Sequence, residues 1–172
     1  LPLFIKVAEF IKKKNKNIQF VLGVAKNMNL KDFVVPEWIN IEYTNPQKAL
    51  ECADLAIVAS GTATIEATVF GTPMIIVYKM RLLSWWLSKL FIKVNYAGMV
   101  NIIAKKEIMP EFLQNNAKVK PLGEEAFNII NNPTYLDKMN FELSKIKEKL
   151  KRKNASQKAA KHILSLSNID DF

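Results

Sequence analysis

The chain has 172 residues, of which 49% are hydrophobic and 24% are charged, and its formal net charge is +9. This length fits one domain and this apolar share supplies a core, so an intrinsically disordered chain is excluded. No run of about eighteen uncharged apolar residues occurs, so we expect no membrane-spanning helix.

The positive charge is carried mainly by lysine and favours anionic partners. Phosphorylated ligands, an anionic membrane surface and nucleic acid all fit this charge, which does not choose among them. The single cysteine, Cys52, excludes an internal disulfide and suits a reducing cytoplasm. Its small side chain is expected to be buried.

The first half of the chain alternates the patterns of helix and strand. Apolar residues three and four apart indicate helices, and short apolar or alternating runs indicate strands. In chain order these patterns predict a helix at 1–16, strands at 18–25 and 38–43, a helix at 44–54, a strand at 55–59, a helix at 62–70 and a strand at 74–78. Thr44 or Asn45 is expected to cap the helix at 44–54, with Pro46 in its first turn. The alternation predicts an α/β fold, a Rossmann-like parallel sheet with flanking helices.

The strands at 55–59 and 74–78 read LAIVA and MIIVY, continuous apolar runs that are typical of strands buried on both faces. Beyond residue 80 the pattern is mainly helical. Helices are expected at 82–93, 107–115, 123–131, 134–153 and 155–166.

One of these helices has an unusual distribution of aromatic residues. The stretch RLLSWWLSKLFIKV (81–94) forms a broad apolar face, but Trp85 and Ile92 fall among polar residues on the other side. Either a second protein surface covers them or they contact lipid, since Trp beside Lys is typical of interfacial helices. Both interpretations are left open.

The stretch ASGTATIEATVFGTPMIIVY (59–78) holds the strongest candidate for a binding site. Ser60, Gly61 and Thr62 follow a predicted strand and precede a helix, which is where open parallel sheets bind ligands. Gly61 permits a tight turn, and the free amides at the start of the helix favour an anion. Hydroxyl groups at Ser60, Thr62 and Thr64 add candidate donors. The alternative is that Ser-Gly-Thr only caps the helix.

Glu66 strengthens the first interpretation. A capping box would need Ser or Thr three residues earlier, where the chain has Ala63. Helical side chains lean toward the start of their helix, so Glu66 is placed to accept hydrogen bonds from a sugar diol at the end of the sheet. The alternative is a solvated surface glutamate. Gly71, in the following Gly-Thr-Pro turn, is interpreted as the residue that ends the helix.

The segments DLAIVASGTATIEATVFGTPMIIVYKM (54–80) and LSWWLSKLFIKVNYAGMVNIIAKKEIMPEFLQ (83–114) resemble a known family. They are similar to the C-terminal domain of lipid-A-disaccharide synthase, a two-domain glycosyltransferase of the B type in glycosyltransferase family 19. The Asn-Ile-Ile-Ala segment points to this family in particular, because other sugar-nucleotide transferases and epimerases share the Ser-Gly-Thr and Gly-Thr-Pro turns. The resemblance implies one C-terminal nucleotide-sugar-binding domain over 1–172, with C-terminal helices over 134–166.

The activity implied by the resemblance is an inverting transfer of 2,3-diacylglucosamine from its UDP derivative to 2,3-diacylglucosamine 1-phosphate, giving lipid A disaccharide 1-phosphate and UDP. It implies that Ser60, Gly61 and Thr62 lie near the diphosphate, that Glu66 lies near the ribose, and that Asn101 is a polar active-site residue. No cofactor or metal is expected. The implied partners are the lipid-linked UDP-sugar donor, the lipid acceptor and an anionic inner-membrane surface reached from the cytoplasm; a homo-oligomer is left open.

Two features of the sequence depart from the family pattern. Val100 stands where the family has Pro, and Lys105 stands where it has Gly, which would cost roughly 1 kcal/mol if that position needs a positive φ. The sequence also starts after the point where the family's strand and Gly-Ser-Arg loop are expected, and it lacks the N-terminal domain with its expected general base. We therefore expect the chain alone to be inactive and to bind UDP weakly.

Two rival functions remain at this point. One is another UDP-sugar glycosyltransferase of the B type, whose Gly-Gly-Ser pattern we do not find. The other is a non-catalytic basic domain that binds a membrane or a protein partner. The basic stretch KIKEKLKRK (145–153) is interpreted as a solvated helix face, and nucleic acid is not an expected partner.

Overall fold

The structure, a computed structural model of the chain, describes residues 1–25, 28–79, 96–151 and 155–167. The helix expected at 82–93, with Trp85 and Ile92, lies outside these residues. The described helices are α1 (Pro2–Lys14), α2 (Gln47–Glu51), α3 (Thr62–Phe70), α5 (Met99–Ala104), α6 (Val119–Ile130), α7 (Pro133–Leu150) and α8 (Ala155–Ser167). The described strands are β1 (Phe20–Gly23), β2 (Ile39–Glu42), β3 (Ala56–Ala59), β4 (Met74–Tyr78) and β5 (Glu111–Leu113), with a 3₁₀ turn η1 (Gln114–Asn116).

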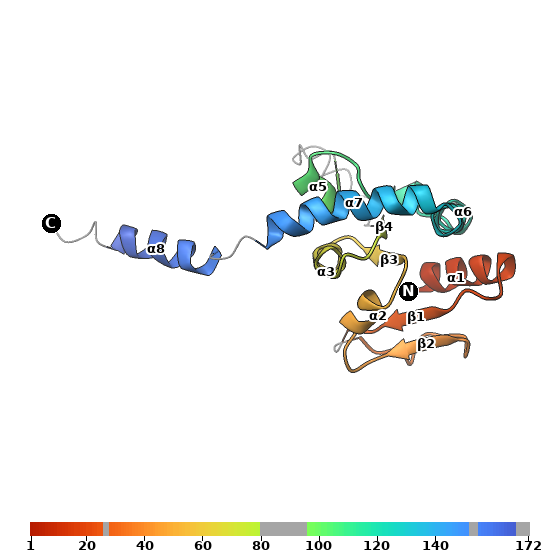
Figure 1. The fold of residues 1–172 in the computed structure, drawn as a ribbon. Coiled ribbons are helices and arrows are strands. Elements are labelled where there is room, and N and C mark those ends of the chain that lie inside the picture. The colour runs from red at the N-terminus through yellow and green to blue at the C-terminus, as the bar shows by residue number, and fades with distance from the viewer. Residues whose placement is uncertain (26–27, 80–95, 152–154, 168–172) are drawn as a thin grey trace.

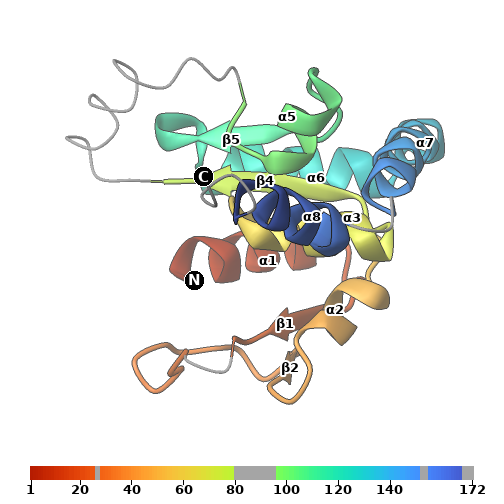
Figure 2. The same cartoon turned by 90° about the vertical axis from the view of Figure 1, so that its left-hand side faces the viewer.

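The strands form two parallel sheets, β1–β2 and β3–β4–β5. In the larger sheet Val58 pairs with Ile76, and Ile76 pairs with Glu111. The β3–α3–β4 unit agrees with the sequence prediction, and so does the parallel direction of the strands. Figures 1 and 2 show β1 between β2 and the larger sheet, so the edge of β1 that is not paired with β2 is directed toward β3.

Helices cover both faces of the sheets. In Figure 1, α1 and α6 lie to one side, and α2, α3 and α5 lie to the other. The apolar stripe of α1 contributes Val7 and Ile11 to the core, and α1 packs closely on α6 at Gly123, where a Cβ atom would collide with the ring of Phe10. The core is therefore centred on β4, whose residues Met74 to Ile76 are fully buried.

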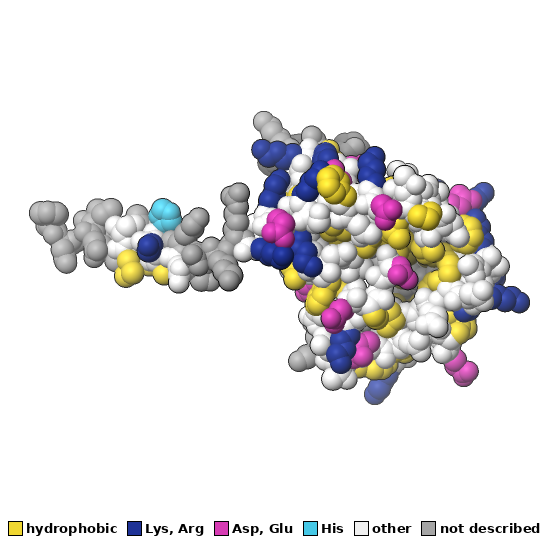
Figure 3. Space-filling model, in the orientation of Figure 1, with side chains coloured by type: hydrophobic (Ala, Val, Ile, Leu, Met, Phe, Trp, Pro, Cys, Tyr) yellow, Lys and Arg dark blue, Asp and Glu magenta, His cyan; other side chains and the backbone are white. Residues whose placement is uncertain are grey.

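The C-terminal helices extend from this core. Helix α7 buries one stripe (Met139, Leu143 and Ile146), and α8 projects away from the body (Figure 1). Lysine side chains gather over the C-terminal end of α7, toward α8 (Figure 3). Among the described residues, no helix combines the length and the apolar character needed to cross a membrane.

The helix predicted at 107–115 is wrong. Residues Glu111–Leu113 form β5 instead, and residues Gln114–Asn116 form the 3₁₀ turn. Pro110 disfavours a helix through this segment, while its carbonyl oxygen accepts a hydrogen bond of 2.9 Å from the amide of Ile76. Pairing with the free edge of β4 therefore decides the conformation.

Three smaller predictions also need correction. Neither Thr44 nor Asn45 caps α2 with its side chain; the amides of both donate to Oε1 of Glu42 at 2.8 and 2.9 Å, and these bonds lower the pKa of that carboxyl. Strand β3 is buried on one face only, because Ile57 and Ala59 are partly or fully accessible. Cys52 is exposed rather than buried, since it follows the last residue of α2 at the surface.

Candidate functional site

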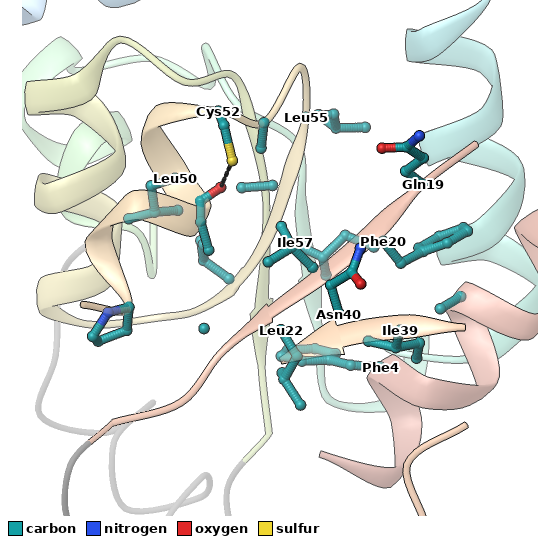
Figure 4. A pocket seen from close by; sticks show the side chains of 18 of the residues that line it. Phe4, Gln19, Phe20, Leu22, Ile39, Asn40, Leu50, Cys52, Leu55 and Ile57 are labelled. Carbon is teal, nitrogen blue, oxygen red and sulfur yellow. Dashed lines mark hydrogen bonds between the residues drawn. The ribbon is translucent and has the colours of Figure 1, made fainter. Parts of the chain in front are cut away.

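A cavity of about 1700 Å³ lies between the two sheets. Strand β1 lines one side of it and strand β3 the other, and α1 contributes apolar side chains. Figure 4 shows Phe20 and Leu22 of β1 and Leu55 and Ile57 of the β3 segment among its lining residues. The cavity also reaches Leu1 and the first turn of α3, so the starts of two helices meet it at the carboxyl ends of the strands.

The Ser-Gly-Thr turn has the backbone geometry expected of an anion site. Gly61 is the N-cap of α3 and has φ 135° and ψ −152°, a region that is open almost only to glycine. A Cβ atom at Gly61 would meet nothing within 4 Å, so the space beside the turn is open. Within the described residues, the amides of Gly61, Thr62 and Ala63 have no hydrogen-bond acceptor.

The hydroxyl groups of the turn are used differently from what the sequence predicts. Ser60 Oγ donates to the carbonyl oxygen of Ala97 at 2.7 Å, and Thr64 Oγ1 donates to that of Gly61 at 2.8 Å. Both protons are thus engaged within the fold. Thr62 is exposed and keeps its hydroxyl available to a ligand.

Glu66 lies one helical turn after Thr62, and both residues line the cavity together with Ala63. Glu66 is partly buried, and among the described residues it has neither a hydrogen-bond nor an ion-pair partner. The structure therefore brings Thr62 and Glu66 together at the cavity. Ser60 and Gly61 precede them in the turn without lining the cavity themselves.

Asn101 lies elsewhere, on the core-facing side of α5, where it is fully buried. Its Nδ2 donates to the carbonyl oxygen of Met109 at 2.7 Å and to Oε1 of Glu111 at 2.8 Å. Its Oδ1 accepts from the amides of Ile108 and Met109 at 2.9 and 3.0 Å. These contacts satisfy the whole side chain and tie α5 to the segment before β5; a catalytic role for Asn101 stays a prediction.

Helices α3 and α5 both end at a residue with a left-handed backbone. Gly71 ends α3 with φ 83°, and its amide donates to the carbonyl oxygens of Ala67 and Thr68. Lys105 ends α5 with φ 57°, so the position where the resemblance expects Gly does have a left-handed conformation. The interpretation of Gly71 as a helix end is confirmed, and Lys105 carries the predicted backbone strain.

Sequence reasoning missed Glu111 as a residue of this region. Its carboxylate accepts from the amides of Ala97 and Gly98 and from Asn101. The sequence places Glu111 after Pro110 in a segment predicted to be helical, and nothing in that pattern predicts these hydrogen bonds. Only the pairing of β5 with β4 brings it beneath α5.

Comparison with known proteins places these observations in a family. The sequence model of a family described as "Lipid-A-disaccharide synthetase" matches residues 1–164. The chain is 32% identical to a lipid-A-disaccharide synthase of Syntrophus aciditrophicus (strain SB), over 99% of the chain and 46% of that protein. It is 31% identical to the lipid-A-disaccharide synthase of Coxiella burnetii (strain CbuG_Q212), over 96% of the chain and 45% of that protein. The chain thus spans about half the length of the curated relatives it matches.

Proposed function

Because the chain belongs to the lipid-A-disaccharide synthetase family, we propose that it is the part of a lipid-A-disaccharide synthase that binds the UDP-linked donor. The whole protein would transfer 2,3-diacylglucosamine from UDP-2,3-diacylglucosamine to 2,3-diacylglucosamine 1-phosphate, with inversion at the anomeric carbon and release of UDP. The observation that carries this proposal is that, among the described residues, the first amides of α3 and the nearby Glu66 have no partner and lie at one cavity.

In the proposed complex the diphosphate lies at the start of α3. The amides of Gly61, Thr62 and Ala63 and the hydroxyl of Thr62 donate to its oxygens, and the positive end of the helix favours its charge. Ser60 contributes through its place in the turn. The same donors stabilise the charge that develops on UDP as it leaves, and they act without reorganisation because the fold already holds them.

Glu66 is proposed to recognise the ribose. A carboxylate accepts two hydrogen bonds, which suits the two vicinal hydroxyls of a ribose. Four residues, a rise of about 6 Å along the helix, separate Thr62 from Glu66, and this distance is similar to the step from a phosphate to the sugar that carries it. A nucleoside diphosphate therefore fits the two residues at once.

The cavity also supports the proposal that the whole protein holds more of this domain. Strand β1 pairs in parallel with β2, and β3 pairs in parallel with β4. Within the described residues, neither β1 nor β3 has a strand partner on the side that faces the cavity. A single parallel strand placed there would join both sheets into one. Followed by α1 and β1, it would form a β-α-β unit like β3–α3–β4. We propose that a segment joined to Leu1 supplies this strand and the following loop.

The crevice at the carboxyl end of such a strand would be a topological switch point, where α1 and α3 leave on opposite sides of the sheet. Open α/β sheets bind nucleotides at such points. The general base for the acceptor hydroxyl is proposed to lie in the further domain of the whole protein. The chain alone is therefore expected to be inactive and to bind UDP weakly.

Membrane contact at the cytoplasmic face of the inner membrane is part of the proposal. Both substrates carry acyl chains, and the net charge of +9 suits an anionic surface. Flotation of the chain with vesicles of anionic lipid and with vesicles of neutral lipid tests this point. Binding to the anionic vesicles alone, weakened by salt, is expected, whereas no flotation with either would contradict it.

The activity is tested with the whole protein. It is incubated with UDP-2,3-diacylglucosamine and 2,3-diacylglucosamine 1-phosphate, and the disaccharide product and UDP are followed by mass spectrometry. Equal amounts of the two products are expected, and Glu66→Gln should lower kcat/KM by about tenfold or more for loss of a charged hydrogen bond. Release of UDP without the acceptor, or no product at all, would contradict the proposed reaction.

A further inference from the structure

The carboxylate of Glu111 gathers three hydrogen-bond donors at the start of α5. Its Oε2 lies 2.7 Å from the amide nitrogen of Ala97, and its Oε1 lies 2.9 Å from that of Gly98. Oε1 also accepts from Nδ2 of Asn101 at 2.8 Å. A carboxylate is suited to this place, since it is an acceptor only and its charge complements a helix start.

The peptide groups of Ala97 connect Glu111 to the Ser-Gly-Thr turn. On one side of Ala97 the amide donates to Glu111, and on the other its carbonyl oxygen accepts from Oγ of Ser60 at 2.7 Å. The amide of Ser60 donates to the carbonyl oxygen of Val77 at 2.9 Å, which fixes this residue to β4. Ser60 is therefore held from two directions immediately before Gly61.

The two hydrogen bonds that join Glu111 to Ser60 through Ala97 form a bridge, and packing makes this bridge rigid. Gly98 is buried and lies directly on Ile76 of β4, where an added Cβ atom would collide with Cδ1 of Ile76. Ile76 is also the register partner of Glu111 in β5. Gly98 and Glu111 therefore both contact the sheet at Ile76 of β4, beside β3, the strand that Ser60 follows.

We propose that Glu111 is a positioning residue of the donor site. Through Ala97 it fixes Ser60, and through Ser60 it holds the free amides of Gly61, Thr62 and Ala63 in place. Glu111 does not line the cavity, so it acts without touching the nucleotide. The identity of the ligand rests on the proposed function, whereas the bridge rests on the contacts alone.

Glu111→Gln distinguishes the hydrogen-bonding role of this residue from the effect of its size. Glutamine has nearly the same size but presents one acceptor oxygen and one NH₂ donor to three N–H groups. At least one donor then faces another donor. The matched control is Glu124→Gln, the same charge change on an exposed residue of α6 whose nearest cation, Lys120, is 3.9 Å away.

The first experiment needs no ligand and uses the ¹⁵N-labelled chain. In Glu111→Gln the amide resonances of Ala97 and Gly98 should shift, those of Ser60 to Ala63 should shift with them, and exchange of the Ala97 and Gly98 amides should rise about tenfold or more. Exchange along β3 and β4 should stay as in the unaltered chain, and Glu124→Gln should change none of these signals. Shifts confined to Ala97 and Gly98, or a uniform rise in exchange, would overturn the proposal.

Ser60→Ala tests the same link at the Ser60 hydroxyl. It replaces the first experiment if the Glu111→Gln variant does not fold. It removes only the hydroxyl that contacts Ala97, so the resonances of Ala97 and Gly98 should shift although neither residue is altered. An unchanged Ala97 resonance would overturn the proposed link.

The second experiment measures UDP affinity by titration of the same resonances. Each single substitution should weaken binding by about tenfold, which is about 1.4 kcal/mol. The double variant Ser60→Ala, Glu111→Gln should have about the same affinity for UDP as the single variant of lower affinity, because both substitutions act through Ala97. Fully additive losses would overturn the proposal. If the unaltered chain bound no UDP, the proposed function would fail while the ligand-free experiment would still decide the role of Glu111.

Discussion

The hydroxyl of Ser60 donates to the carbonyl oxygen of Ala97, 37 residues further along the chain, over 2.7 Å. The bond joins the turn before α3 to the turn before α5, and so connects the proposed donor site to the segment that Asn101 and Glu111 hold. The free amides of the site are therefore fixed by residues that do not line the cavity.

Lys105→Gly should raise the free energy of unfolding by about 1 kcal/mol. Lys105 has φ 57° at the end of α5, and glycine adopts this conformation without the steric cost that a Cβ atom brings. Urea denaturation of the two chains measures the difference. Lys105→Ala is the control, because alanine keeps the Cβ atom and should change stability by only a few tenths of a kcal/mol. Equal stability of the glycine and alanine variants would show that the backbone is not strained there.

Gly61→Ala should destabilise the chain by about 1–3 kcal/mol. The cost comes from the backbone alone, since φ is 135° and an added Cβ atom meets nothing within 4 Å. Thr62→Ala, at the exposed neighbour, should cost much less. Thermal unfolding of both variants decides the point. A neutral Gly61→Ala would mean that the turn has a different conformation, and the free amides would then point elsewhere.

Asn101→Ala should lower the free energy of unfolding by about 2–4 kcal/mol, because it leaves buried donors and acceptors unpaired. The side chain is fully buried and makes four hydrogen bonds. The exposed Asn115 gives the control, since Asn115→Ala should stay within about 0.5 kcal/mol of the unaltered chain. A stable Asn101→Ala chain, combined with loss of transfer in the whole protein, would instead favour the direct catalytic role that the family resemblance implies.

Alkaline pH should destabilise the chain through Tyr135. Burial raises the pKa of its phenol to about 12, and the hydrogen bond of 3.0 Å to Glu125 adds to this shift. The folded chain keeps the phenol proton where the unfolded chain, with a pKa near 10, has lost it. This contribution to stability is therefore complete below about pH 10 and is lost as the pH rises to about 12.

Urea denaturation at about pH 8 and about pH 11 measures this effect, with Tyr135→Phe as the reference without a phenol. The stability of the unaltered chain should fall more steeply between the two pH values than that of the Phe variant. Glu125→Gln keeps an acceptor but removes the negative charge, so the phenol pKa should decrease and the difference should shrink. Parallel pH profiles for the unaltered and Phe chains would rule out the raised pKa.

Local sequence patterns predicted the β3–α3–β4 unit well, because periodicity, the glycine at each end of α3 and the buried run of β4 act over short distances. Strand β5 could not be predicted in this way, since Glu111–Leu113 is extended only by pairing with β4. The turn at Ser60 was predicted correctly, but its hydroxyl was predicted to face a ligand and instead donates to the carbonyl oxygen of Ala97. Ala97 belongs to a segment that is distant in the sequence. The sequence placed Thr62 in the turn after β3 and Glu66 on the following helix, and both line the cavity, although their binding roles stay predictions. The contacts of Glu111 depend on tertiary structure that no local pattern predicts.

The start of α3 and Glu66 are proposed to bind a nucleoside diphosphate together. An NMR titration of the ¹⁵N-labelled chain with UDP and with 2′,3′-dideoxy-UDP, repeated for Glu66→Gln, tests this binding. Shifts are expected at Gly61, Thr62, Ala63 and Glu66. The unaltered chain should prefer UDP over the dideoxy nucleotide, and Glu66→Gln should lose that preference. Shifts elsewhere in the chain, or a preference for UDP that survives in Glu66→Gln, would contradict the proposed binding.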